Sequence, residues 1–171
     1  MKKHYHTFAG YNAWANRRLY DAAAELGDAE YRADRGAFFK SMHGTLNHLL
    51  ATDRIWMKRF TGAGDAPERL DAILHEGFTE LRTAREAEDR RIAAWIESLD
   101  KASLASVIRY RRVSNPEAFV QELMPALDHW FNHQTHHRGH AHMILTSLGK
   151  VAPELDLLFY QREVASGLRR S

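Results

Sequence analysis

The sequence has no cysteine and few of the residues that interrupt helices. Without a thiol, the chain cannot form a disulfide scaffold, bind zinc or an iron–sulfur cluster through cysteine, or use a cysteine nucleophile. Only 4 prolines and 10 glycines punctuate the 171 residues, which favours a few long helices over many short strands. These absences predict a helical protein whose site chemistry relies on nitrogen and oxygen groups.

Long hydrophobic runs and a strong charge imbalance are also missing. No stretch approaches the 18 apolar residues of a transmembrane helix, and the start, Met1–His6, is not followed by the apolar segment of a signal peptide. We therefore expect a cytoplasmic protein with no membrane partner. The net charge is only +2, and the basic patches Arg109–Arg112 and Arg169–Arg170 are short, so we expect no nucleic-acid partner.

Apolar residues recur at helical spacing along most of the chain. The 171 residues, 44% of them hydrophobic and 27% charged, predict one globular domain over residues 1–171. The spacing predicts four long helices: one from Tyr5 to a stop at Gly27, one over Phe39–Phe60, one from Pro67 to Leu99, and one from Pro125 to a stop at Gly149.

Two segments outside these stripes complete the predicted architecture. Residues 101–121 alternate weakly and contain the turn signal Val113–Pro116, which predicts a short hairpin or an extended connection. Residues Leu155–Val164 follow a turn at Pro153 and predict a short last helix. The fold class is therefore all-α, a four-helix bundle with an up-down or crossover arrangement.

The most unusual feature is the number of histidines, 11 in all, six of which fall between His129 and His142. On a helical wheel, His133, His137 and His140 lie in the same arc as the apolar residues of the fourth helix. His133 and His137 are one turn apart on one face. Buried imidazoles need partners, because an unpaired buried polar group costs about 1–3 kcal/mol. A divalent metal ion would satisfy the pair, and the alternative is a hydrogen-bonded core or surface cluster.

A third ligand is available on the second predicted helix. His48 follows Gly44 by one turn, and helical side chains lean toward the N-terminus, so we expect Gly44 to leave room for the His48 ring. His43 points elsewhere on the wheel and is better explained as a surface residue or as a residue that supports the ligands. Together with the pair on the fourth helix, His48 is the natural third nitrogen.

These residues resemble a known family. The string Asn132–His140, preceded by Gly44–His48 on an earlier helix, resembles the DinB-like proteins, and the likeness in layout spans nearly the whole chain. The resemblance implies a four-helix bundle, usually dimeric, with one divalent metal ion held by three histidines. By position these ligands are His48, His133 and His137. DinB-like proteins commonly have Gln where this chain has His140.

The ligand set indicates which chemistry to expect. Three neutral imidazoles suit Zn²⁺, Ni²⁺ or Fe²⁺ and leave a position open for water or a substrate thiolate. The ion lowers the pKa of the group bound there. Relatives include thiol-dependent S-transferases and an isomerase, so the resemblance implies a metal-dependent S-transferase or hydrolase acting on a small molecule, with a low-molecular-weight thiol as a candidate partner.

Two other functions remain open at this point. One is a non-catalytic, metal-binding or stress-associated homodimer whose ion only stabilises the bundle. The other has no metal and uses the histidines as a pH-sensitive core, since histidine titrates near neutrality. An enzyme needs a solvent-connected site, whereas a structural ion should be enclosed.

Several further residues have more than one interpretation. Asp53 could act as a general base or accept a hydrogen bond from a ligand imidazole, but a salt bridge to an arginine on another helix is favoured. His140 could join the metal, orient a water or merely pack. Arg138 could bind an anionic substrate, although a structural pairing is the simpler expectation. Tyr110 and Trp130 are candidates for the walls of the metal pocket.

Overall fold

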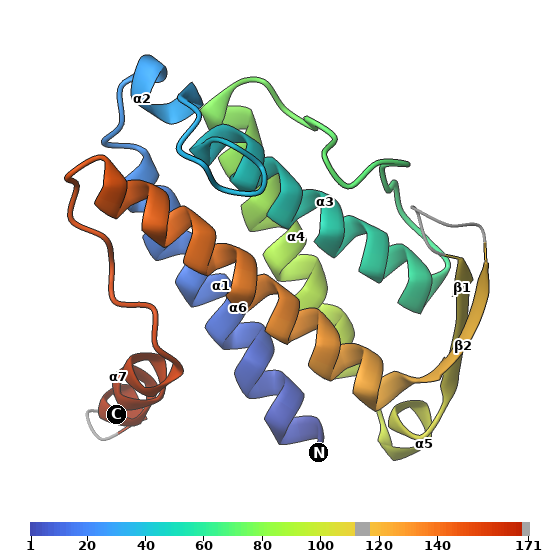
Figure 1. Ribbon diagram of the computed structural model, residues 1–171. Helices are drawn as coiled ribbons and strands as arrows, with labels where there is room; N and C mark the ends of the chain where they lie inside the picture. The colour runs from blue at the N-terminus through green and yellow to red at the C-terminus, as the bar shows by residue number, and fades with distance from the viewer. Residues whose placement is uncertain (112–116, 169–171) are drawn as a thin grey trace.

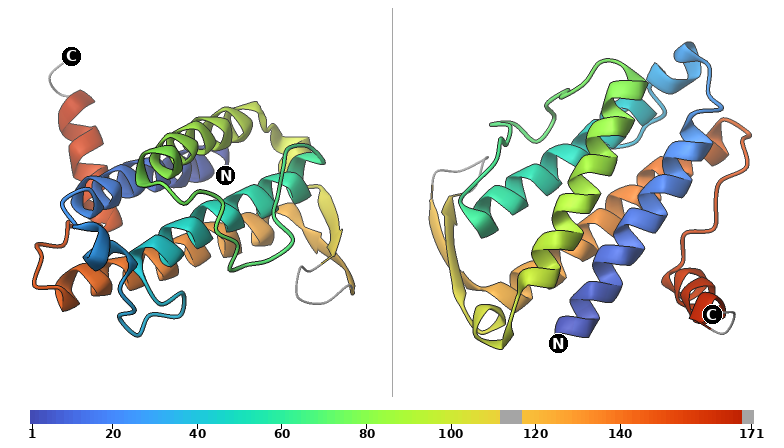
Figure 2. Two further views of the ribbon diagram at one scale, coloured as in Figure 1. Left: turned by 90° about the horizontal axis from the view of Figure 1, so that it is seen from above. Right: turned by 180° about the vertical axis from the view of Figure 1, so that it is seen from behind.

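Four long helices make up the computed structural model, which describes residues 1–111 and 117–168 (Figure 1). Helices α1 and α4 form one side of the bundle, and α3 and α6 form the other (Figure 2). Each helix packs against its partner in the pair and against one helix of the other pair, so that α1 and α3 both contact α4 and α6. The all-α bundle is therefore confirmed, with these bounds: α1 Lys2–Ala23, α3 Met42–Thr61, α4 Phe78–Ser98 and α6 Leu123–Ser147.

The connection between α3 and α4 differs from the prediction. Residues 62–77 are irregular, so the helix expected from Pro67 begins only at Phe78. Gly62 ends α3 with a φ of 70°, and Gly64 has a φ of 92°, a left-handed conformation that favours glycine. Because α3 and α4 both run from the α2 end of the bundle toward the hairpin, this segment crosses back along α3 (Figure 1).

Two short helices were not predicted. Gly27 does not stop the first helix, which already ends at Ala23; it is instead the N-cap of α2 (Asp28–Arg32). Helix α5 (Lys101–Leu104) begins after Asp100, whose carboxylate accepts a hydrogen bond from the backbone N–H of Ser103. Both helices lie in segments too short for a helical period to be visible in the sequence.

The predicted hairpin before the last long helix is confirmed. Strands β1 (Val107–Arg111) and β2 (Ala118–Glu122) pair antiparallel, with Val107 opposite Glu122. The expected turn at Val113–Pro116 lies outside the described residues. The last element of the described residues is α7 (Leu157–Leu168), which contacts α1 and stands beside the bundle (Figure 2).

Within residues 1–111 and 117–168, no helix combines the length and the apolar character that crossing a membrane requires.

The core is divided by a layer of buried polar side chains. One apolar cluster surrounds Trp130 and Ile92, and a second surrounds Leu46 and Ile144. Between them lie polar residues from all four long helices: Asn16, Asp53, Arg85, Asp89 and Gln134. Arg85 Nη1 is 2.7 Å from Asp53 Oδ2, and Arg85 Nη2 is 2.9 Å from Asp89 Oδ1. The expected salt bridge of Asp53 to an arginine of another helix is thus confirmed.

Candidate metal centre

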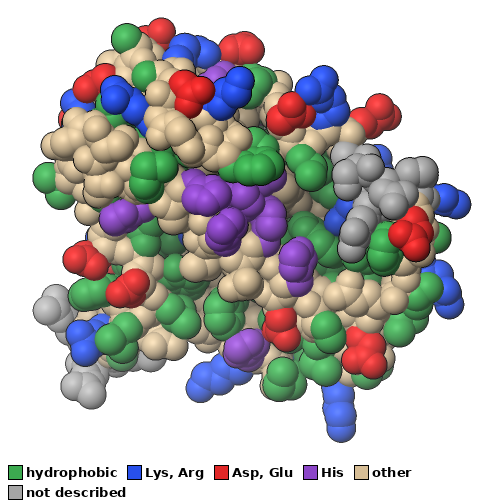
Figure 3. Space-filling model, in the orientation of Figure 1, with side chains coloured by type: hydrophobic (Ala, Val, Ile, Leu, Met, Phe, Trp, Pro, Cys, Tyr) green, Lys and Arg blue, Asp and Glu red, His purple; other side chains and the backbone are tan. Residues whose placement is uncertain are grey.

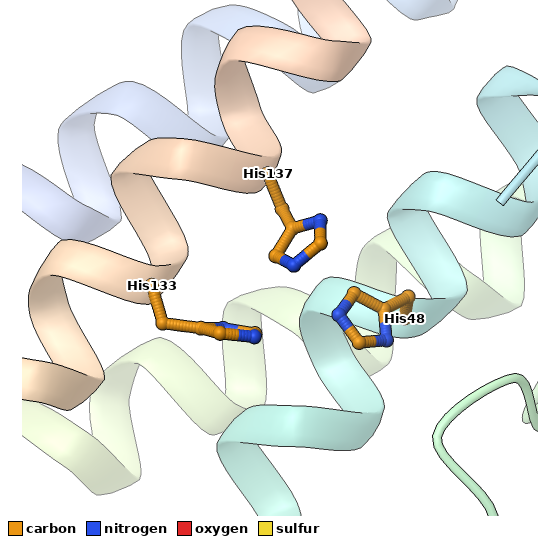
Figure 4. A group of neighbouring side chains, drawn as sticks. All are labelled: His48, His133 and His137. Atoms are coloured by element: carbon orange, nitrogen blue, oxygen red, sulfur yellow. The ribbon is translucent and has the colours of Figure 1, made fainter. Parts of the chain in front are cut away.

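Three histidines from two helices meet at the seam between α3 and α6 (Figure 4). The possible ligand atoms of His48, His133 and His137 all lie within 4.8 Å of one another. The His137 ring centroid is 4.4 Å from those of both His48 and His133, and one nitrogen of each ring faces the gap between them (Figure 4). The residues that the sequence singled out are therefore neighbours in space, and we call them the inner histidine group.

The hydrogen bonding of His48 decides which nitrogen can bind a metal. Its Nδ1 lies 2.7 Å from the carbonyl oxygen of Leu70. Because a carbonyl only accepts, Nδ1 must carry the proton, which leaves the lone pair on Nε2. That Nε2 is buried and has no hydrogen-bond partner. An imidazole held by a backbone carbonyl on one nitrogen, with the other unpaired, is the arrangement typical of metal-ligating histidines.

The pKa values of all three histidines lie well below the ordinary value. Burial lowers the pKa of His48 and His133 to about 4 and that of His137 to about 3, and the neighbouring imidazoles add to the effect. All three rings are therefore neutral at pH 7, the form that coordinates a metal. An all-imidazole set of this kind suits Zn²⁺, Ni²⁺ or Fe²⁺.

The Leu70 carbonyl is available because its segment is not helical. In a helix this oxygen would accept a backbone hydrogen bond from the following turn. Asn47 fixes the segment instead: its Oδ1 accepts from the N–H groups of Leu74 (2.8 Å) and His75 (3.0 Å), and its Nδ2 donates to the carbonyl of His75 (3.2 Å). Sequence reasoning missed Asn47 and Leu70 because it predicted a helix here.

Phe39 covers one side of the inner group. Its ring stacks on His48 at 3.6 Å between centroids and lies 5.5 Å from His137. The nearest neighbour of Gly44 is the backbone of Phe39, which the sequence did not predict: a Cβ on Gly44 would sit 2.2 Å from the carbonyl oxygen of Phe39, so a glycine is needed for this close approach. The neighbouring Phe38 is exposed.

His43 is not part of the inner histidine group, as expected, but it is buried instead of lying on the surface. Its Nε2 is 3.2 Å from the carbonyl oxygen of His75, and its ring packs 5.4 Å from Tyr31. The side chain thus helps to hold the segment after α3 against the bundle.

Other candidate residues have structural roles. Trp130 is fully buried and donates from Nε1 to Asp53 Oδ1 at 2.6 Å, so it belongs to the polar layer and does not form a pocket wall. Tyr110 packs on Trp56 at 5.4 Å. Arg138 lies on the α1 side of α6, buried, and donates to Asn12 and to Thr135 Oγ1, which matches the structural pairing favoured above.

His140 takes part in a second cluster. The possible ligand atoms of His136, His137 and His140 also lie within 4.8 Å of one another, and we call these the outer histidine group. His136 is exposed and His140 half-buried. The sequence signal for this cluster is the four-residue spacing of His136 and His140. On a helical wheel, however, His136 lies at the edge of the apolar arc of α6 and not within it.

The helical wheel is right for His137, which is 8% exposed, but it placed His133 and His140 too deep, because both are half-buried. Histidine side chains gather on the surface in the middle of the face shown in Figure 3, over the α3–α6 seam. Solvent therefore reaches this region. Openness of this kind favours a site that exchanges ligands over an enclosed structural ion.

Comparison with known proteins places the sequence and the fold among known relatives. The sequence matches the DinB family over residues 1–166. It is 25% identical over 158 residues to the protein DinB of Bacillus subtilis (strain 168). That match covers 88% of this chain and 89% of the Bacillus protein. The structure resembles that of YfiT from Bacillus subtilis, described as a probable metal-dependent hydrolase with an unusual four-helix bundle topology. That match has a TM-score of 0.66 and 12% identity, and it covers 88% of this chain and 91% of that one.

Proposed function

Because the chain belongs to the DinB family, we propose that it is a metal-dependent enzyme whose inner histidine group holds one divalent ion. The observation that carries the proposal is His48, whose Nδ1 is fixed by the Leu70 carbonyl while its buried Nε2 has no partner. Zn²⁺, Ni²⁺ and Fe²⁺ are the candidate ions.

The residues present suit such an ion. Three neutral nitrogens from His48, His133 and His137 would hold it and leave at least one position for another group. When bound, a divalent ion lowers the pKa of a water or thiol beside it and so supplies a nucleophile near neutral pH. Phe39 shields His48 and His137 from solvent on one side, which directs an incoming molecule to the remaining open side.

The reaction we propose is hydrolysis of a small molecule. The description of YfiT as a probable metal-dependent hydrolase supports this, as does the partial exposure of His133, which lets solvent reach the inner histidine group. Transfer of a low-molecular-weight thiol is the second candidate, and the observation that favours it is the ligand set: three neutral nitrogens leave the full double charge of the ion available to a thiolate.

The proposal is tested with protein stripped of metal and reloaded with one ion at a time. Activated esters and amides are offered without a thiol, and electrophiles are offered with a low-molecular-weight thiol. We expect metal-dependent turnover in the wild type and in His142→Gln, a control for a histidine of α6 outside both groups. His133→Gln should lose turnover while keeping its helical circular dichroism spectrum.

The outcomes separate the candidates. Turnover without a thiol identifies a hydrolase, and turnover only with a thiol identifies an S-transferase. Metal binding without turnover across the whole panel favours the non-catalytic homodimer with a structural ion. Turnover that persists in His133→Gln or in metal-free protein contradicts the proposed role of the inner group.

A further inference from the structure

The outer histidine group has the features of a metal site in its own right. His136 and His140 are four residues apart on α6, so their rings lie on adjacent turns of one face, with centroids 4.6 Å apart. His137 lies beside both, at 4.8 Å from His136 and 5.0 Å from His140. The possible ligand atoms of all three lie within 4.8 Å, a spacing that modest side-chain rotations bring to metal–ligand geometry.

The unpaired nitrogen atoms of this group also point to a cation. The Nδ1 atoms of His137 and His140 are buried without a hydrogen-bond partner, and such atoms in proteins are normally satisfied. The donors are all nitrogen, which selects transition-metal ions such as Zn²⁺ and Ni²⁺ over Mg²⁺ and Ca²⁺.

The position of the outer group relative to the inner one indicates what it does. His136 is exposed, His140 is half-buried and His137 is buried, so the outer group leads from solvent to the inner group. His137 belongs to both groups. An ion taken up at the surface by His136 and His140 is therefore already next to a ligand of the inner group.

We propose that His136, His137 and His140 form a second, weaker site for a divalent transition-metal ion, through which the inner group receives its ion. The loading role rests on the proposed binding of an ion by the inner group, but the existence of the outer site does not. Metal uptake in this protein then depends on two histidines that are not ligands of the final site.

The outer site is tested where the inner group has been disabled. The double variant His48→Gln/His133→Gln keeps all three outer histidines, and its binding of Ni²⁺ is measured by isothermal titration calorimetry. We expect one weakly bound Ni²⁺ per chain. Adding His136→Gln and His140→Gln should weaken this binding at least about tenfold, whereas adding His142→Gln should not. Binding that does not respond to the His136 and His140 substitutions overturns the site.

The loading role is tested by the rate of uptake. Metal-free protein is mixed with Zn²⁺, quenched with excess chelator at set times and analysed for bound zinc. We expect His136→Gln/His140→Gln to load about tenfold more slowly than the wild type, with the same final zinc content. Equal rates overturn the role of the outer group in loading, and catalytic assays do not enter either measurement. Circular dichroism spectra of all variants establish that each is folded.

Discussion

At the scale of single residues, the orientation of His48 depends on two residues that bind no metal themselves. Leu70 accepts the Nδ1–H hydrogen bond of His48, and Asn47 holds the segment that carries Leu70. Asn47 is fully buried, so its hydrogen bonds cannot be replaced by water without opening the structure. The candidate site therefore extends one layer beyond the three imidazoles.

Asn47→Ala tests this supporting layer. The substitution leaves the N–H groups of Leu74 and His75 without their partner, and we expect a loss of about 1–3 kcal/mol in the free energy of unfolding. Because the Leu70 carbonyl is no longer fixed, metal affinity should fall about 10- to 100-fold. Urea denaturation and metal titration measure the two effects, with exposed Asn132→Ala as the control. Unchanged metal affinity in Asn47→Ala would show that Leu70 does not position His48.

Gly44→Ala tests the contact between α3 and the segment before it. A Cβ would lie 2.2 Å from the Phe39 carbonyl oxygen, so the backbone of Phe39 must move. We expect a destabilisation of about 1–3 kcal/mol and weaker stacking of Phe39 on His48. Gly139→Ala on α6 is the matched control: no atom lies within 4 Å of its Cβ, and the change should stabilise the helix by about 0.5–1 kcal/mol. Thermal unfolding measures the stability of both variants. Equal changes in melting temperature would contradict this role of Gly44.

Site residues could be predicted from the sequence where their pattern lies within one helix. His133 and His137 are recognisable because a four-residue spacing places two rings on one helix face. His48 follows from its place on an earlier helix taken together with this pair, and from the resemblance. Phe39, Asn47 and Leu70 could not be found, because their roles depend on contacts between segments that no local pattern records. The nearest neighbour of Gly44 could not be predicted either, since it is a backbone oxygen from outside the helix.

At the scale of elements, the long helices were predictable and their connections were not. Apolar spacing identifies α1, α3, α4 and α6, because a helix that buries one face must repeat apolar residues at that period. The segment 62–77 contains Leu70 and Leu74 at the same spacing, yet it is irregular. Asn47, 27 residues before Leu74, accepts a hydrogen bond from the Leu74 N–H. The spacing of apolar residues cannot reveal a partner so distant in the sequence.

The buried charges that join the helices provide a prediction at this scale. Arg85 of α4 is 1% exposed and lies between Asp53 and Asp89. Removing it in Arg85→Met leaves two buried carboxylates without their cation, and we expect a loss of about 3–5 kcal/mol in unfolding free energy. Arg82→Met, which removes solvent-exposed ion pairs of the same helix, should cost less than about 1 kcal/mol. Similar losses by urea denaturation would contradict the proposed importance of the polar layer.

At the scale of the whole molecule, the pKa values of the inner histidine group make the stability of the protein depend on pH. The pKa values of His48 and His133 are about 4 and that of His137 about 3 in the folded protein, against 6.5 for an ordinary histidine. Between about pH 4 and 6.5 the unfolded chain therefore binds more protons at these positions, and stability falls as the pH falls. Burial raises the pKa of Asp53 to about 6 in the folded protein. Below pH 6 the folded protein therefore binds a proton that the unfolded chain does not, and this offsets the pH effect of one of the three histidines.

We therefore expect the melting temperature of the metal-free protein to decrease from pH 7 to pH 4.5. Bound metal should be released over the same range, because protons compete for the ligand nitrogens. The triple variant His48→Gln/His133→Gln/His137→Gln lacks the titrating groups, so its melting temperature should change less with pH. An equally steep decrease in the triple variant would assign the pH dependence to other residues.

The most direct measurement of the central claim is X-ray absorption spectroscopy at the zinc edge. The sample is His136→Gln/His140→Gln loaded with one equivalent of Zn²⁺, a variant that lacks the outer histidine group and keeps the inner one. We expect a first shell with three imidazole nitrogens at about 2.0–2.1 Å, reduced to two when His48→Gln is added. A shell without imidazole scattering, or one that His48→Gln leaves unchanged, would contradict the assignment of His48, His133 and His137 as the metal ligands.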